Sequence, residues 1–223
     1  WLQFAAGADL RSNSHDQVAA RFEMSDRGLQ RPAVALRRLS ATLARGPVTV
    51  DIGKQFIRWG QTDIVTPTDR LAPRDFLDVL NPEFLPVAAL RVGLRRGGQT
   101  IDVAWLPRFT PSRMPLLDQR WTPSSTLAPT VRLEPGAGVY PEGSQVGIRW
   151  SRTAERAEYA ISFFDGFNSA PTLVPEPPAF DRNVVRLGRR YQALRSFGPI
   201  TVLHSHGSRS SPRSPCLRHQ MAT

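Results

Sequence analysis

The sequence predicts an all-β fold, an antiparallel up-and-down meander that forms a partial or incomplete transmembrane β-barrel. The first observation is a repeated pattern, in which segments of about ten residues alternate apolar side chains with polar or arginine side chains. The second is the order of the connections, because short turns alternate with long segments. The short turns lie at Gly46-Pro47, Gly97-Gly98 and Thr153-Ala154, and the long connections at 60–86, 109–143 and 167–183.

The strand predictions follow from side-chain alternation along the chain. Between Val48 and Trp59, three apolar residues share one face opposite Thr49 and Asp51, as a strand between hydrocarbon and a polar interior requires. A Gly97-Gly98 turn marks the clearest hairpin, because two alternating segments flank it. The expected strands and hairpins are 1–10 paired with 17–24, then 33–45, 48–59, the hairpin 87–107, the hairpin 146–163, and a last strand 184–197.

Composition divides the chain into two parts. Residues 1–201 are expected to form the partial barrel domain, and 202–223 a disordered tail, because this tail lacks alternation and acidic residues. The abrupt change suggests that the tail is out of frame or otherwise unrelated to an ancestral barrel. The chain also starts at Trp1 without a signal-peptide core, so we expect an N-terminal portion of a longer barrel, nonfunctional when truncated.

The charge is strongly positive, and it comes from arginine. The net charge is +10, and Lys54 is the only lysine among the 29 basic residues. These arginines are scattered along strand-like segments and do not gather on one helix or beside an RNA-binding aromatic motif, so nucleic acid is not an expected partner. Cys216 is the only cysteine, so the chain cannot form an internal disulfide or a cysteine-based zinc site.

One stretch carries a family resemblance. The segment KQFIRWGQTDIVTPTDRLAPRDFLDVLNPEFLPV, together with the later WLPRFTPSRMPLLDQRW and SFFDGFN, resembles porin-like outer-membrane β-barrels of Gram-negative bacteria, a broad group that includes alginate-export-type channels. The resemblance spans roughly residues 1 to 200. It implies a pore in the bacterial outer membrane with lipid as its surroundings. Complete members have more strands than this sequence shows.

Eight charged residues are candidates for contact with a solute, and they fall in two groups. The first group is Arg58, Asp63, Asp69, Arg74 and Asp75, in or beside the first long connection, where mixed charges could narrow a pore. The alternative for this group is that Asp and Pro shape turns and cap a short helix near 75–80. The second group is Arg91, Arg95 and Arg149 on the polar strand faces. They suggest anion-favouring conductance, or alternatively an arginine ladder paired with Asp51 and Asp102.

The expected function is therefore passive or selective passage of small polar or anionic solutes, without catalysis, cofactor or metal. No Gly-rich phosphate loop, HExxH or GxSxG motif occurs in the sequence. The alternative is a secreted or periplasmic soluble β-domain that binds carbohydrate through Trp and Tyr. That alternative expects Leu90 and Trp105 in a dry core, whereas a barrel places both on its outer surface. The sequence does not predict an oligomeric state.

Overall fold

The protein is described from a computed structural model, in which every regular element of the described residues is a β-strand. The structure describes residues 1–10, 34–59, 69–77, 82–115, 132–154, 157–177 and 184–203. In these ranges there is no helix with the length and hydropathy needed to cross a bilayer. The all-β, largely antiparallel fold expected from side-chain alternation is confirmed.

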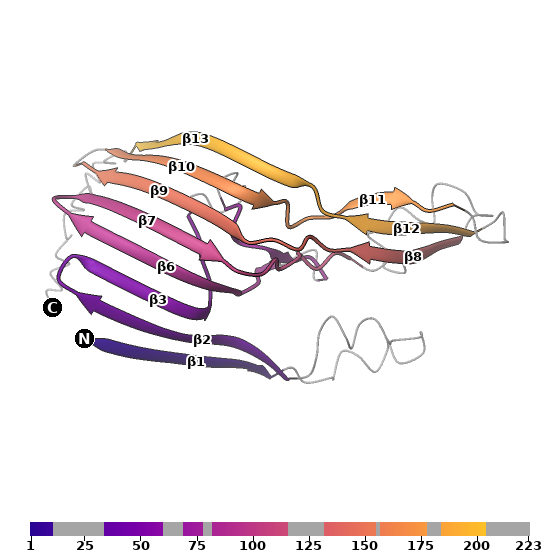
Figure 1. Ribbon diagram of the computed structural model, residues 1–223, viewed down its shortest axis with the longest axis horizontal. Helices are drawn as coiled ribbons and strands as arrows, with labels where there is room; N and C mark the ends of the chain where they lie inside the picture. The colour runs from indigo at the N-terminus through magenta and orange to yellow at the C-terminus, as the bar shows by residue number, and fades with distance from the viewer. Residues whose placement is uncertain are drawn as a thin grey trace, which may run out of the picture.

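The main sheet has eight strands, and each strand is antiparallel to its neighbours (Figure 1). Their order in the sheet follows the order in the chain, with the strands of the two smaller sheets set aside. These strands are β1 (Leu2–Leu10), β2 (Val34–Arg45), β3 (Val48–Gln55), β6 (Val87–Arg96), β7 (Gln99–Leu106), β9 (Gln145–Thr153), β10 (Ala157–Phe167) and β13 (Ala193–Leu203). The outer strands β1 and β13 pair on one side only, so the described sheet is open.

Three tight hairpins lie at one end of the main sheet, at the left in Figure 1. The predicted turn at Gly97-Gly98 joins β6 to β7, and both glycines have positive φ, 56° and 74°, as a two-residue hairpin turn requires. The turn at Gly46-Pro47 joins β2 to β3, and residues 154–156 join β9 to β10. The hairpins predicted at 87–107 and 146–163 are therefore confirmed.

A smaller sheet extends from the opposite end of the main sheet, and we call it the arm (Figure 1). It consists of β11 (Thr172–Pro175), β12 (Val184–Arg190) and β8 (Arg132–Val139), in that order. β12 pairs with β8 in parallel and with β11 antiparallel. The segments 109–143 and 167–183, predicted as connections, thus contain strands, and one pair departs from the antiparallel meander. Local periodicity missed the parallel pair because its strands lie far apart in the sequence.

One other strand prediction is corrected. The segment 184–197 was expected to be one strand, but it is divided between β12 in the arm and β13 in the main sheet, with Tyr191 and Gln192 between them. Alternation continues through both parts, so it could not show that the pairing partner changes. The described partner of β1 is β2, and the predicted pairing with 17–24 lies outside the described ranges.

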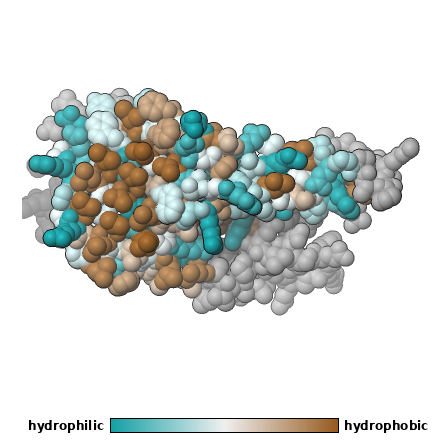
Figure 2. All heavy atoms as spheres, in the orientation of Figure 1, coloured by the Kyte–Doolittle hydropathy of each residue, from teal (hydrophilic) through white to brown (hydrophobic). Residues whose placement is uncertain are grey.

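The register aligns apolar side chains into a continuous row across all eight strands, which we call the apolar row. Its members are Leu2, Leu43, Val50, Val92, Val103, Ile148, Phe163 and Phe197. Most of these side chains are exposed, and neighbouring rows on the same face add Trp105 and Ile101, which are also exposed. Figure 2 shows hydrophobic residues gathered over the main sheet, with hydrophilic residues at the turn end and over the arm.

The buried cluster lies on the other face of the main sheet. It contains strand residues that alternate with the apolar row, and it also contains residues from the chain that follows β3. Its members are Ile57, Trp59, Leu71, Val87, Ala89, Ala104, Leu106 and Phe164. The segment after β3 therefore folds over the polar face of the sheet, and we call residues 56–59 and 69–77 the covering segment.

Candidate functional site

The centre of the polar face carries a network of paired charges. Arg91 donates two hydrogen bonds to Asp102, at 3.1 Å from Nε and 3.0 Å from Nη2. Asp102 also lies directly opposite Arg149 in the register of β7 and β9. Arg149 in turn forms an ion pair of 3.3 Å with Glu158. Two of the arginines predicted to contact a solute are therefore neutralised by neighbouring carboxylates.

The predicted ladder between arginine and aspartate is present in part. Asp102 has the expected arginine partner, whereas the carboxylate of Asp51 accepts a hydrogen bond from the hydroxyl of Thr42. Asp51 also lies opposite Arg91 in the register of β3 and β6. The alternation of charge from strand to strand gives this face no excess of positive charge at its centre.

The covering segment is held by an aromatic side chain packed against a glycine. Trp59 is 3% exposed, and a Cβ added at Gly147 would lie 2.6 Å from its ring and 2.8 Å from Leu71. Only glycine permits this approach of the segment to β9. The indole Nε1 of Trp59 is buried and has no hydrogen-bond partner among the described residues. Packing, not polar pairing of the indole, holds this end of the segment.

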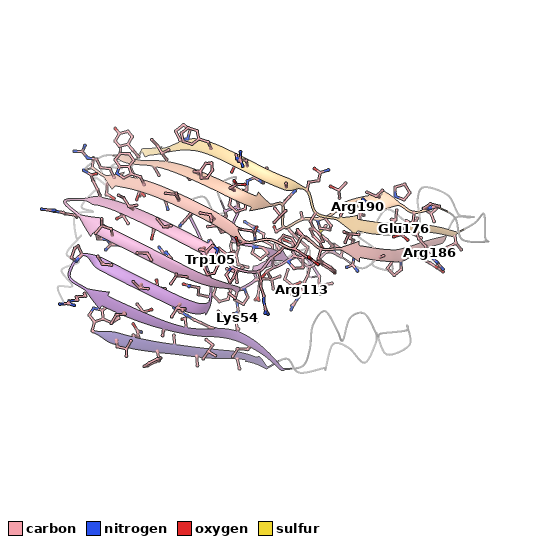
Figure 3. The ribbon with its side chains drawn as sticks, viewed as in Figure 1. Lys54, Trp105, Arg113, Glu176, Arg186 and Arg190 are labelled. Atoms are coloured by element: carbon pink, nitrogen blue, oxygen red, sulfur yellow. The ribbon has the colours of Figure 1, made fainter. Side chains whose placement is uncertain are left out.

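Two of the predicted aspartates hold the covering segment in place. Asp69 accepts a hydrogen bond of 2.5 Å from the backbone N–H of Trp59, which closes the segment on itself. Asp75, in the short strand β4 (Arg74–Asp75), is 1% exposed and forms an ion pair of 3.1 Å with Arg113. The backbones at these two positions also form a parallel bridge. Figure 3 places Arg113 at the junction between the main sheet and the arm.

A short helix was the alternative proposed for residues 75–80. The carboxylate of Asp75 accepts a hydrogen bond of 3.1 Å from the backbone N–H of Leu77, so it shapes a turn. Residues 75–77 are not helical, and residues 78–80 lie outside the described ranges. Asp63 lies outside them too, so its predicted place in a pore stays a prediction.

Two of the arginines predicted to contact a solute lie against the same aromatic ring, which the sequence analysis did not identify. The guanidinium carbons of Arg58 and Arg74 each lie 4.4 Å from the ring centroid of Phe84, which is in β5 (Glu83–Phe84). β4 pairs with β5, so this group belongs to the polar side of the sheet beside the covering segment. Arg58 is exposed and forms no ion pair with a described residue.

Arg95 lies apart from this group. It is exposed near the Gly97-Gly98 turn, at the opposite end of the sheet from the covering segment. The seven predicted residues that the structure describes therefore do not form one site: some hold the covering segment, two are ion-paired on strands, and Arg58 and Arg74 flank Phe84. Sequence reasoning missed Trp59, Gly147 and Arg113 as the residues that fix this arrangement, because their contacts join distant parts of the chain.

In the described ranges, no group of three or more His, Cys, Asp or Glu side chains is placed to hold a metal ion.

No protein-family model matches the chain, and no curated protein or solved structure does either.

Proposed function

We propose that this chain forms part of the wall of a porin-like β-barrel channel in a bacterial outer membrane, through which small polar or anionic solutes pass without a catalytic step. The apolar row carries this proposal. It crosses all eight strands of the main sheet and is mostly exposed. Lipid acyl chains suit such a surface, because a barrel presents alternate apolar side chains to hydrocarbon and polar ones to its interior.

The two ends of the main sheet differ in their connections, and this difference suggests how the proposed barrel wall is oriented in the membrane. The three tight turns share one end, whereas the covering segment and the arm lie at the other (Figure 1). Outer-membrane barrels have short turns on the periplasmic side and long loops outside. The arm is then an extracellular element, and the covering segment narrows the polar side of the wall below it.

If the chain were instead a soluble β-domain that binds carbohydrate, Trp105 would lie in a dry core. This side chain is 44% exposed, and it lies on the same face as the apolar row. Trp105 comes from strand β7 of the main sheet and is labelled in Figure 3. An exposed aromatic residue in a continuous apolar surface favours contact with lipid over burial between two sheets.

Any preference for anions comes from the covering segment in this proposal. The strand arginines Arg91 and Arg149 are paired with carboxylates, whereas Arg58 is exposed and has no such partner in the described residues. An unneutralised guanidinium in a narrow polar passage attracts anions, as rings of charge do in selective pores.

Partition between detergent and water tests the membrane assignment. The purified chain is mixed with a detergent that separates into two phases on warming, and the protein in each phase is measured. We expect the chain in the detergent-rich phase, because the exposed apolar row needs an apolar solvent. Recovery of folded protein in the aqueous phase contradicts the proposal.

Reversal potentials in planar bilayers test the passage of ions. A gradient of potassium chloride across the bilayer should give an anion-selective potential for the wild type. Arg58→Gln should shift this potential toward cation selectivity, because it removes the exposed charge without changing the side chain's length greatly. Arg95→Gln, at the turn end, is the matched control and should shift it less. Cation selectivity of the wild type would contradict the anion preference.

A further inference from the structure

A cluster of four aromatic rings lies where the main sheet meets the arm, and we call it the junction cluster. Its members are Phe109, Tyr140, Phe167 and Tyr191. Phe109 follows β7, Tyr140 follows β8, Phe167 ends β10, and Tyr191 separates β12 from β13. Four distant parts of the chain thus bring an aromatic side chain to the same place.

The rings of the junction cluster contact one another in a chain. Tyr140 stacks on Tyr191 with ring centroids 5.4 Å apart and an angle of 23° between the planes. Phe109 meets Tyr191 edge-on at 4.8 Å, and it meets Phe167 edge-on at 6.0 Å. A backbone hydrogen bond of 2.9 Å from Asn168 to Gln192 fixes the end of β10 against the residue after Tyr191. These contacts pack the four rings into one aromatic platform.

One ring of this platform remains open to a ligand. Tyr140 is 50% exposed, although Tyr191 stacks on one of its faces and Gly138 lies against its ring. It lines an open pocket of about 440 Å³ together with Phe109, Arg108, Glu142 and Ser144. This volume lies within the range of about 300 to 1,000 Å³ that is common for small-molecule sites.

The polar groups of the pocket narrow the chemistry of the ligand. Arg108 supplies only hydrogen-bond donors, and the carboxylate of Glu142 supplies only acceptors. Both are exposed, and neither forms an ion pair with a described residue. An anionic ligand is attracted by Arg108 and repelled by Glu142. A cationic ligand is attracted by Glu142 and repelled by Arg108. A neutral hydroxyl satisfies both, because it donates one hydrogen bond and accepts others.

We infer that the junction pocket binds a neutral sugar ring of an oligosaccharide, which packs against the exposed part of the Tyr140 ring and exchanges hydroxyl hydrogen bonds with Arg108 and Glu142. The apolar face of a pyranose ring matches the flat tyrosine, and its hydroxyls point to the rim. Tyr191, stacked behind Tyr140, positions the ring and is not expected to touch the sugar. The inference goes beyond the proposed channel and holds whether or not solutes cross the membrane.

Calorimetric titration of the full chain in detergent micelles tests this inference, with maltohexaose, cellohexaose and trigalacturonate as probes. We expect at least one neutral hexasaccharide to bind, and to bind more tightly than the acidic trisaccharide. Tyr140→Ala should weaken this binding about tenfold, because it removes the stacking surface, whereas Tyr140→Phe should retain it. Binding by neither neutral sugar, or equal binding by the alanine variant, would overturn the inference.

A second variant keeps the test valid if Tyr140→Ala fails to fold. Glu142→Gln changes one exposed side chain with little change in shape, and it should weaken neutral-sugar binding about tenfold by removing a charged acceptor. Tyr159→Ala is the matched control, since Tyr159 is 46% exposed but lies in β10 on the opposite face from the buried cluster. Its sugar affinity should be that of the wild type.

The titration also separates this inference from the channel proposal. Binding is measured without a bilayer or a current, so sugar binding by a chain that stays in the aqueous phase of the detergent partition contradicts the membrane channel alone. Conductance by a chain that binds neither neutral sugar contradicts the pocket alone. Tighter binding of trigalacturonate that Arg108→Gln abolishes would show an acid-binding pocket and overturn the neutral-sugar assignment.

Discussion

The two faces of the main sheet come from the same eight strands, yet they differ in what covers them. The apolar face is mostly exposed, whereas the polar face carries ion pairs and is partly buried beneath the covering segment. A sheet with one packed face in a water-soluble protein normally buries its apolar side. This sheet leaves its apolar row mostly exposed, which is the arrangement that the proposed barrel wall requires.

The largest expected effect comes from the packing of the covering segment. Trp59→Ala should lower the free energy of unfolding in detergent by about 3 to 5 kcal/mol, because it leaves a cavity against Gly147 and Leu71. Chemical denaturation followed by circular dichroism measures this change. Trp59→Phe is the control, and it should cost much less because it keeps a ring in place and removes an indole N–H that has no described partner. A cost below about 1 kcal/mol for the alanine variant would show that the segment does not stabilise the polar face.

A charge placed on the apolar face should have the next largest effect. Val103→Arg puts a guanidinium in the middle of the apolar row, and it should destabilise the chain in lipid vesicles by about 2 to 4 kcal/mol. Thr49→Arg, on the polar face of β3, is the matched control and should stay within about 0.5 kcal/mol of the wild type. Equal effects of the two variants, measured by denaturation in vesicles, would remove the distinction between the faces.

Ion pairs on the polar face should contribute more to the free energy of unfolding than ion pairs between well-exposed side chains. Arg91→Ala leaves the carboxylate of Asp102, whose side chain is 11% exposed, without its bidentate partner, and it should cost about 1 to 3 kcal/mol. Arg195→Ala breaks a shorter pair with Asp165, but both side chains are well exposed, so it should cost less than about 1 kcal/mol. Urea titrations of both variants provide the comparison. A larger loss for Arg195→Ala would contradict the view that the polar face is the interior.

The smallest expected effect concerns the junction cluster. Burial raises the pKa of Tyr191, the neighbouring Tyr140 adds to this rise, and Arg189 opposes it. The folded state therefore favours the protonated phenol. Its contribution to stability is full below the unfolded pKa of about 10 and is lost as the pH rises through the higher folded pKa.

Absorbance of tyrosinate during a pH titration measures this shift. A late-titrating component should be present in the wild type and absent from Tyr191→Phe, while Tyr159→Phe should retain it. A titration curve in which Tyr191→Phe removes an early component would contradict the effect of burial.

Much of the main sheet could be predicted from the sequence. The alternation in 87–107 and 146–163, together with the Gly97-Gly98 turn, specified both strands of each hairpin, because neighbouring strands with a short turn leave little choice of register. The arm could not be predicted in the same way. Its parallel pair joins β8 to β12 across a long stretch of chain, and no local pattern encodes such a partner.

The candidate site was predicted less completely than the sheet. Charge and residue type pointed to Arg58 and Arg74, but not to Phe84, which brings them together. The sequence also could not show that Asp75 would be buried against Arg113. Both contacts depend on how the covering segment folds back over the sheet, which is decided by the fit of Trp59 on Gly147.

The two outer strands differ in one respect that affects how copies of this chain would meet. β13 contains Pro199, which has no backbone N–H to offer, whereas the residues of β1 from Leu2 to Leu10 include no proline. An uninterrupted edge is the better template for adding a further strand. Unwanted polymerisation during expression or refolding should therefore nucleate at β1, and a proline introduced there would be the first change to try for a monodisperse sample.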